Sequence, residues 1–391
     1  MSAISVSNFD VAGDCVVPGP VPVASFAPGV SNVFPKYVDK LSDTAWELWY
    51  FDGGSGDGRT AFTVSFFRDA RGLKEGGWRV QVFALWPDGA MWNKELYFPE
   101  SILTADGSLD GQVEGVWKEH DNRSSVSFIV EPHVSGATLT FRVPGLIEGT
   151  VVMASMDGND QGLPHSEADA LLCPDMYYLR PISLADAKAD LVFPDINGAA
   201  GSSREFAFTS GRGGMDRCWT PFSWPQLLCE SYFLRANIGP YNMQLMRILS
   251  TEATGRKPYA TARLWKGQKL VCAAQQAILP ADLERFTQDG PVPDQDAVIV
   301  EQVYENNRDG PGVTGAFRDK NVGYVVHFIG RGKEGERWRF ETRHTQPWWN
   351  MPTSPPGPNA TGNSAFLDTV SGGAQGEAWP AGTGGSGQLE L

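Results

Sequence analysis

The chain lacks the apolar runs and basic patches that would direct it to a membrane or to nucleic acid. No segment approaches the ~20 consecutive apolar residues of a spanning helix. The 391 residues carry a formal net charge of −14, which disfavours nucleic acid and anionic membrane surfaces as partners. Residues 1–23 lack the basic and continuous apolar parts of a signal peptide. We therefore expect a soluble, cytoplasmic protein whose substrate is neutral or small.

Cysteine is scarce and its spacing forms no motif. The five cysteines are widely separated, their number is odd, and no CxxC occurs. A disulfide framework or a zinc site is therefore not expected, and buried free thiols are the simpler interpretation. Cys173 could act as a nucleophile, but no basic residue adjoins it in the sequence, which favours an inert thiol.

Motifs for nucleotide binding and hydrolysis are missing as well. The sequence contains no GxxxxGK[ST], HExxH or GxSxG. Gly330–Gly335 matches GxGxxG, but the next segment, Trp338–Arg343, alternates like a strand, so a charged hairpin turn is the better prediction. The five histidines do not cluster at metal spacing. His327 and His344 lie in strand-like segments and could face a pocket, although satisfied strand histidines are more common.

What the sequence does contain is short strands separated by turns. Glycine (44), proline (27), tryptophan (13) and phenylalanine (21) are all numerous. Within Trp78–Trp86, residues of even number share one face and residues of odd number share the other, which predicts a strand. Only residues 166–172 and 280–286 read as short helices. We predict an antiparallel all-β fold, a sandwich or a barrel.

The length favours two domains. Gly211–Gly214, followed by Pro221 and Pro225, is a break in the strand pattern. We place the boundary near residue 210, which gives domains 1–210 and 211–391.

The chain is rich in aromatic residues, yet it shows no acid–base pair or triad. Most large aromatics in β-proteins fill cores. An apolar cavity with a few polar groups is the alternative, because ligand sites in β-barrels usually have this character. Tyr177 and Tyr178 are adjacent, so in a strand their side chains point to opposite faces.

Several segments, in order along nearly the whole chain, carry a family resemblance. They are Asn32–Lys36, Trp46–Trp49, Arg68–Gly72, Ala84–Gly89, Leu96–Phe98, Leu172–Pro174, Tyr177–Tyr178, Gly213–Met215, Trp224–Pro225, Gly239–Tyr241, Asn321–Tyr324, Pro352–Ser354 and Ser371–Ala374. In these segments the chain resembles the fungal decalin-forming Diels–Alderases, which are lipocalin-like pericyclases of polyketide–amino acid pathways.

The resemblance implies a fold and a reaction. The fold would be an N-terminal β-sandwich followed by a C-terminal lipocalin-like β-barrel. The reaction would be a stereoselective intramolecular [4+2] cycloaddition, without cofactor or metal, that closes a decalin. The substrate would be a linear polyene joined to a tetramic acid or related pyrrolidinone, supplied by a polyketide–peptide synthetase.

The resemblance also implies site residues, with departures at the head-group end. Tyr178 and Trp224 match aromatic pocket positions, and Ser65 matches a small polar one. Family members can carry Glu where this chain has Tyr50, Asn where it has Phe83, and a late Lys near Thr345. Ser65, Gln81 or Tyr50 would then hold the head group as the catalytic polar residues. Further pocket-lining positions are Phe67, Phe83, Phe233 and Thr345.

Two other functions remain open on the sequence. One is a non-catalytic lipocalin-like carrier of an apolar metabolite. The other is an isoprenoid hydratase or isomerase, which would need a buried Asp or Glu in its pocket. Glu47 and Asp69 are candidates, but paired structural carboxylates are the simpler interpretation of both.

Overall fold

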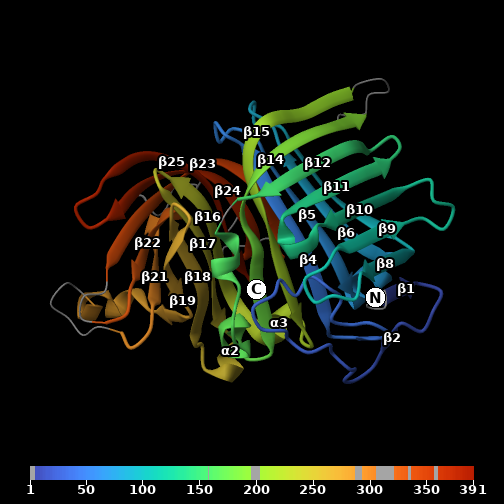
Figure 1. Ribbon diagram of the computed structural model, residues 1–391, viewed down its shortest axis with the longest axis horizontal. Helices are drawn as coiled ribbons and strands as arrows, with labels where there is room; N and C mark the ends of the chain where they lie inside the picture. The colour runs from blue at the N-terminus through green and yellow to red at the C-terminus, as the bar shows by residue number, and fades with distance from the viewer. Residues whose placement is uncertain are drawn as a thin grey trace. The chain divides into compact units, whose positions relative to one another are not determined.

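The computed structural model describes residues 5–156, 158–194, 203–286, 293–304, 321–332, 336–355 and 360–391. The chain divides into two compact units, residues 1–223 and 224–391, and strands dominate both (Figure 1). The predicted all-β class is confirmed. The boundary expected near residue 210 falls inside strand β15 (Ser203–Thr220). The structure divides the chain after this strand, because Gly211–Thr220 pairs with the first unit's β4 (Trp46–Ser55).

The N-terminal unit is built on one sheet, with strands in the order β1-β8-β9-β10-β11-β12-β14-β15-β4-β5-β6-β7 and β13 paired to β14. All its neighbours pair antiparallel. The remaining strands are β1 (Ser5–Asp10), β5 (Ala61–Asp69), β6 (Trp78–Leu85), β7 (Met91–Phe98), β8 (Glu100–Ala105), β9 (Val113–Lys118), β10 (Ser125–Val130), β11 (Gly136–Val143), β12 (Ile147–Ser155), β13 (Leu171–Cys173) and β14 (Met176–Pro194).

Short elements complete this unit. They are β2 (Val16–Val17), β3 (Leu41–Ser42), α1 (Ala70–Lys74), α2 (Glu167–Ala170) and the 3-10 turns Pro132–Val134 and Asn159–Gly162. Of the helix expected over 166–172, the start is confirmed, because Ser166 caps α2 by accepting a hydrogen bond from the Asp169 amide. The helix ends at Ala170, and Leu171 and Leu172 belong to β13.

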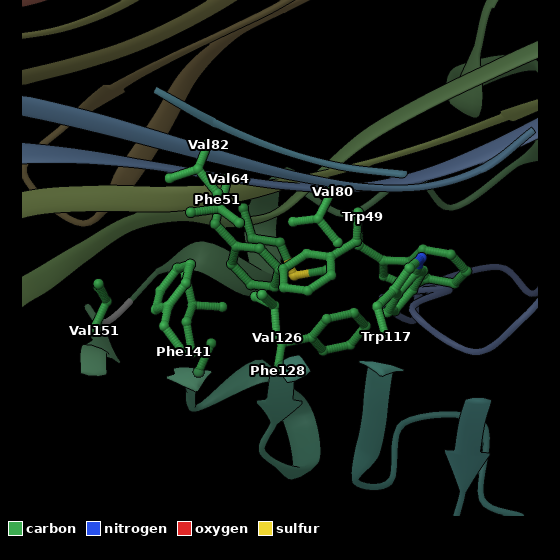
Figure 2. Close-up of a cluster of buried hydrophobic side chains, with 14 of the residues drawn as sticks. Trp49, Phe51, Val64, Val80, Val82, Trp117, Val126, Phe128, Phe141 and Val151 are labelled. Carbon is green, nitrogen blue, oxygen red and sulfur yellow. The ribbon is translucent and has the colours of Figure 1, made fainter. Parts of the chain in front are cut away.

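The sheet folds over so that its two ends enclose one hydrophobic core. Figure 2 shows Val64 and Val82 on one side of this core, with Phe128 and Phe141 facing them from the other. Because side chains alternate along a strand, the even-numbered residues of β5 and β6 enter the core. This arrangement is the expected sandwich, and it leaves the odd-numbered residues of both strands on the opposite face.

The C-terminal unit is a nearly closed barrel with strand order β19-β18-β17-β16-β25-β24-β23-β22-β21-β20. Its strands are β16 (Leu228–Ile238), β17 (Tyr241–Ser250), β18 (Pro258–Lys266), β19 (Lys269–Ala274), β20 (Gln276–Ile278), β21 (Ala297–Tyr304), β22 (Asn321–Ile329), β23 (Arg337–Pro352), β24 (Gly362–Ala374) and β25 (Trp379–Glu390). Short helices are α3 (Trp224–Leu227) and the 3-10 segments Glu252–Thr254 and Pro280–Phe286.

The glycine-rich match at Gly330–Gly335 is a hairpin connection. Strands β22 and β23 pair antiparallel on either side of it, with Ile329 opposite Arg337. A strand therefore follows the glycines instead of the helix that a dinucleotide site needs. Residues 333–335 lie outside the described residues. In the described part of the chain, no helix has the length and apolarity needed to cross a membrane.

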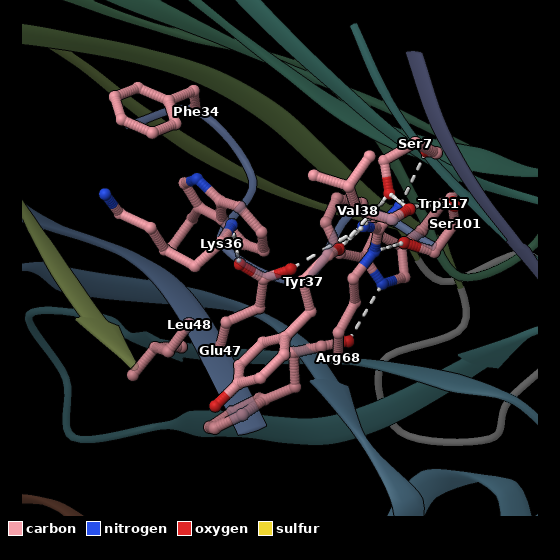
Figure 3. Close-up of polar contacts among 12 residues, drawn as sticks. Ser7, Phe34, Lys36, Tyr37, Val38, Glu47, Leu48, Arg68, Ser101 and Trp117 are labelled. Atoms are coloured by element: carbon pink, nitrogen blue, oxygen red, sulfur yellow. Dashed lines mark hydrogen bonds and ion pairs between the residues drawn. The ribbon is translucent and has the colours of Figure 1, made fainter. Parts of the chain in front are cut away.

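A buried charge cluster ties the segment around Lys36, which precedes β4, to the sheet (Figure 3). Glu47 on β4 is fully buried and accepts from Arg217 Nη2 at 2.6 Å and from the Lys36 amide at 2.9 Å. Arg68 lies 3.6 Å away and donates to Ser7 and Ser101, on β1 and β8. One carboxylate thus joins four segments that are distant in sequence.

Lys36 adds a third cation to this cluster. Its ammonium nitrogen donates to Ser25 O at 2.9 Å and to Asn32 Oδ1 at 2.8 Å. Burial and the nearby Arg217 lower the pKa of Lys36 to about 7, although Glu47 partly opposes them. Removal from water and a like charge nearby both disfavour the protonated amine.

We predict that Glu47→Gln lowers the melting temperature by roughly 6–15 °C, because breaking a buried ion pair costs about 3–5 kcal/mol. Calorimetry or circular dichroism measures the shift. The matched control is Asp88→Asn, which removes the exposed pair between Asp88 and Arg204 and should change the melting temperature little. Equal shifts for both variants would contradict a central role for Glu47.

Lys36 predicts a pH dependence of stability. Unfolded lysine titrates near 10.5, so between about pH 7 and 10 the unfolded state binds more protons, and stability rises with pH. Below pH 7 both states are protonated and this contribution is constant. The melting temperature of the wild type, minus that of Lys36→Met, should rise by a few degrees per pH unit from pH 7 to 9. A difference that does not change with pH would show that the pKa of Lys36 is not lowered in the folded state.

Candidate functional site

A row of polar side chains crosses the N-terminal sheet on the face opposite its core. Residues that pair directly in antiparallel strands share one face. Tyr50 on β4 pairs with Ser65 on β5, and Ser65 pairs with Gln81 on β6. The row extends to Asp216 on β15 and to Glu95 on β7. We call these five residues the polar row.

Apolar side chains flank the polar row on the same face. Phe67 follows Ser65 by two residues on β5, and Phe83 follows Gln81 by two on β6, so each pair shares its face. Both rings are buried, yet neither belongs to the sandwich core. Leu48 pairs with Phe67. The face therefore combines hydrogen-bonding groups with an apolar wall, the composition typical of small-molecule sites.

A buried ion cluster anchors one end of the row. Arg180 on β14 donates to Asp52 at 2.7 and 2.9 Å and to Asp216 at 2.7 Å. Tyr178 donates its hydroxyl to the other oxygen of Asp216 at 2.8 Å. Burial alone lowers the pKa of Arg180, but the two carboxylates together raise it above its usual value. Arg180 stays charged, and it positions Asp216, which holds the Tyr178 ring.

Gly214 makes room for this cluster. A Cβ at this position would overlap the guanidinium nitrogen of Arg180 and the Ile182 carbonyl. The pairing of β14 with β15 also shifts register between Leu179 and Ile182. The irregular strand and the missing side chain together let a large cation lie against the sheet.

Glu95 organises the other end of the row. It accepts from Arg79 at 3.0 Å, from Tyr97 at 2.5 Å and from Gln81 Nε2. Burial acts to raise the pKa of Glu95, but the hydrogen bonds from Tyr97 and Gln81 and the charge of Arg79 lower it overall. Burial and the bond to Glu95 raise the pKa of Tyr97 to about 12. Arg79 also binds Asp69 at 2.6 Å.

Six of the site residues expected from the sequence lie on this one face. They are Tyr50, Ser65, Gln81, Phe67, Phe83 and Tyr178. Tyr177 points the other way and stacks on Trp219 with ring centroids 4.5 Å apart, as predicted for adjacent strand residues. In the described part of the chain, the Ser65 hydroxyl has no hydrogen-bond partner.

The other three expected residues belong to the C-terminal unit, on separate elements. Trp224 begins α3. Phe233 lies on the outer side of the barrel, because its neighbours on β16, Tyr232 and Leu234, enter the core. The Thr345 hydroxyl donates to the Leu367 carbonyl at 2.9 Å, so its one donor is already used.

Other candidates from the sequence have structural partners. Glu47 is paired as described above, and Asp69 pairs with Arg79 and caps α1 through the Gly72 amide at 2.8 Å. Both are the paired structural carboxylates that we expected. Burial raises the pKa of Cys173 to about 12, which favours the inert thiol that we expected.

Both strand histidines are paired as well. His327 contacts Glu301 at 2.8 Å. His344 is fully buried in the barrel, with its Nδ1 2.7 Å from Asp368. Among the described residues, no three His, Cys, Asp or Glu side chains are placed to hold a metal ion.

Sequence reasoning missed Asp52, Arg180, Asp216 and Glu95. For Asp52, Arg180 and Asp216, the only signal in the sequence was the Gly213–Met215 segment. The absence of a side chain at Gly214 leaves the space that Arg180 occupies. Nothing in the sequence signalled Glu95, because its role depends on the register of β6 and β7.

Comparison with known proteins decides the class. The model of a family described as Diels-Alderase-like matches residues 1–391. The chain belongs to this family. Diels-Alderase fsa2 of Fusarium heterosporum is 43% identical over 396 residues, with both chains covered completely. Diels-Alderase cghA of Chaetomium globosum is 38% identical, over 95% of this chain and 74% of the relative.

A solved structure agrees with the family assignment. The crystal structure of CghA with Sch210972 superposes with a TM-score of 0.87 at 36% identity, covering 99% of this chain and 98% of the other. The predicted membership of the fungal Diels–Alderases is confirmed, and the chain is an enzyme, a Diels–Alder cyclase. This assignment replaces the carrier and hydratase alternatives.

We predict that Gly214→Ala displaces Arg180 and lowers the melting temperature by roughly 3–10 °C, since overpacking costs about 1–3 kcal/mol before any loss of ion pairing. Gly56→Ala is the control, because a Cβ there meets only Ser210 at ordinary contact distance. If Gly214→Ala melted like the wild type, Arg180 would not be confined as described.

Proposed function

We propose that this Diels–Alder cyclase closes a linear polyene, tethered to a tetramic acid or related pyrrolidinone, into a decalin of defined stereochemistry. A polyketide–peptide synthetase would supply the substrate. The observation that carries the proposal is the direct pairing of Tyr50, Ser65 and Gln81 beside Phe67 and Phe83. A polar head group and an apolar polyene need such a surface.

A cycloaddition transfers no proton and needs no nucleophile, so binding geometry supplies the catalysis. A flexible polyene loses rotor entropy when it adopts the reactive fold, and a shaped wall moves this loss to the binding step. Tyr178 and Trp224 would shape the folded polyene of the substrate. Further lining residues would be Phe67, Phe83, Phe233 and Thr345. The surface accelerates the reaction only where it fits the transition state better than the extended substrate.

Polar contacts would activate the dienophile. A hydrogen bond to the carbonyl conjugated with it withdraws electron density as the new bonds form. Ser65 is the best-placed donor, because its hydroxyl has no partner within the described residues and lies in the middle of the polar row. One such bond, at about 0.5–1.5 kcal/mol, changes a rate or a diastereomer ratio about two- to tenfold.

The head-group end departs from the family pattern in a consistent way. The family resemblance implies Glu and Asn at the positions of Tyr50 and Phe83, and both positions lie next to Ser65 or Gln81. In this chain the polar contacts would therefore shift along the sheet, from positions 50 and 83 towards Ser65 and Gln81.

The test is a product comparison. The linear polyenoyl tetramate is incubated with the enzyme, with Ser65→Ala and with buffer, and decalin diastereomers are resolved by chiral chromatography. We expect isomeric decalins to form faster with the wild type, with one diastereomer enriched, and Ser65→Ala to lose about two- to tenfold in rate or selectivity. A rate and an isomer ratio equal to those in buffer would contradict this substrate assignment.

A further inference from the structure

We propose that Gln81, oriented by Glu95, makes the enzyme select head groups that carry a ring N–H over those that are N-alkylated. The Gln81 amide oxygen would accept this hydrogen. The inference rests on the proposed function, because it takes the pyrrolidinone head to lie on the polar row.

The orientation of the Gln81 amide follows from its partner. Gln81 stands between Ser65 and Glu95 in direct cross-strand register. Its Nε2 donates to Glu95 Oε1. An ionised carboxylate only accepts hydrogen bonds, so it fixes the NH₂ side of the amide towards β7. The amide oxygen is on the other branch of the planar group and is directed away from Glu95.

Glu95 is itself held firmly in its ionised, acceptor-only form. The hydrogen bonds from Arg79 and Tyr97 fix both of its oxygens, and Arg79 is fixed in turn by Asp69. The Gln81 amide therefore cannot invert without placing its oxygen against a carboxylate. Glu95 is a positioning residue, and Gln81 is the group that would touch the substrate.

The resulting pair of groups matches two polar sites of the head group. Ser65 offers a hydroxyl donor and Gln81 offers a carbonyl acceptor, on adjacent positions of one sheet face. Gln81 would accept from the ring N–H, while Ser65 keeps its single O–H for the carbonyl that is conjugated with the dienophile. An N-methyl group removes the donor and places a methyl against the Gln81 oxygen, which then loses its partner.

The experiment compares two substrates that differ only in the ring nitrogen, N–H and N–methyl. The kcat/KM ratio of the pair is measured for the wild type, Gln81→Leu, Glu95→Gln and Arg71→Ala. Arg71 is the matched control, because it is exposed and its ion pair, at 3.8 Å, is with Glu95 Oε2, whereas Gln81 donates to Oε1. The wild type should prefer the N–H substrate by about three- to tenfold, the effect of one hydrogen bond.

Gln81→Leu should bring the ratio close to one, Glu95→Gln should lower it in part, and Arg71→Ala should leave it unchanged. A wild type that accepts both substrates equally would overturn the proposal. So would a Gln81→Leu that slows both substrates by the same factor, since that indicates a structural role.

Failure of the proposed function gives a different signature. If neither substrate is accelerated, calorimetric binding of the N–H and N–methyl decalin products to the wild type and Gln81→Leu still tests the inference. A wild-type preference for the N–H compound that disappears in Gln81→Leu supports it, and equal affinities contradict it.

Discussion

The contact between Glu47 and two arginines is the constraint on which the N-terminal unit depends. Glu47 lies on β4, Arg217 on β15 and Arg68 on β5, and all three side chains are fully buried. The same cluster holds the segment that precedes β4, through the Lys36 amide. Isolated charges at such depth would be costly, so each group depends on the others. The cluster thereby links β15, β4 and β5, the strands whose pairing aligns Asp216, Tyr50 and Ser65 in the polar row.

Strand alternation places the sandwich core and the candidate site on opposite faces of β5 and β6. Even-numbered residues of β5 and β6 fill the sandwich core, and odd-numbered residues carry the polar row and its apolar flanks. A register slip of one residue would exchange the two faces. The rigid core behind the row gives its side chains fixed positions, which a reaction governed by substrate shape requires.

Two ion clusters fix the ends of the row by the same principle. Arg180 between Asp52 and Asp216 holds Tyr178, and Arg79 between Asp69 and Glu95 holds Gln81. In each case an arginine shared by two carboxylates positions a neighbour that would meet the substrate. In the proposed function, the charged groups on this face would act through the residues they orient.

Much of the fold could be predicted from the sequence, and less of the site. The alternation in Trp78–Trp86 gave the strand and its two faces, and Ser166 gave the start of α2. The family resemblance led us to expect Tyr50, Ser65 and Gln81 as separate site residues. Only the strand pairings show that the three form a row. Arg180 and Asp52 are 128 residues apart in sequence, and no local pattern reports such a pair. The pairing of Glu95 with Gln81 depends on the register of β6 and β7, and turns and packing together determine that register.

The central claim is that the substrate's head group binds on the polar row of the N-terminal sheet. A crystal structure of the enzyme with the decalin tetramate product tests it most directly. The account predicts the pyrrolidinone ring within hydrogen-bond distance of Ser65 and Gln81, with the decalin against Tyr178. A product bound only inside the barrel, against His344 and Asp368, would contradict it.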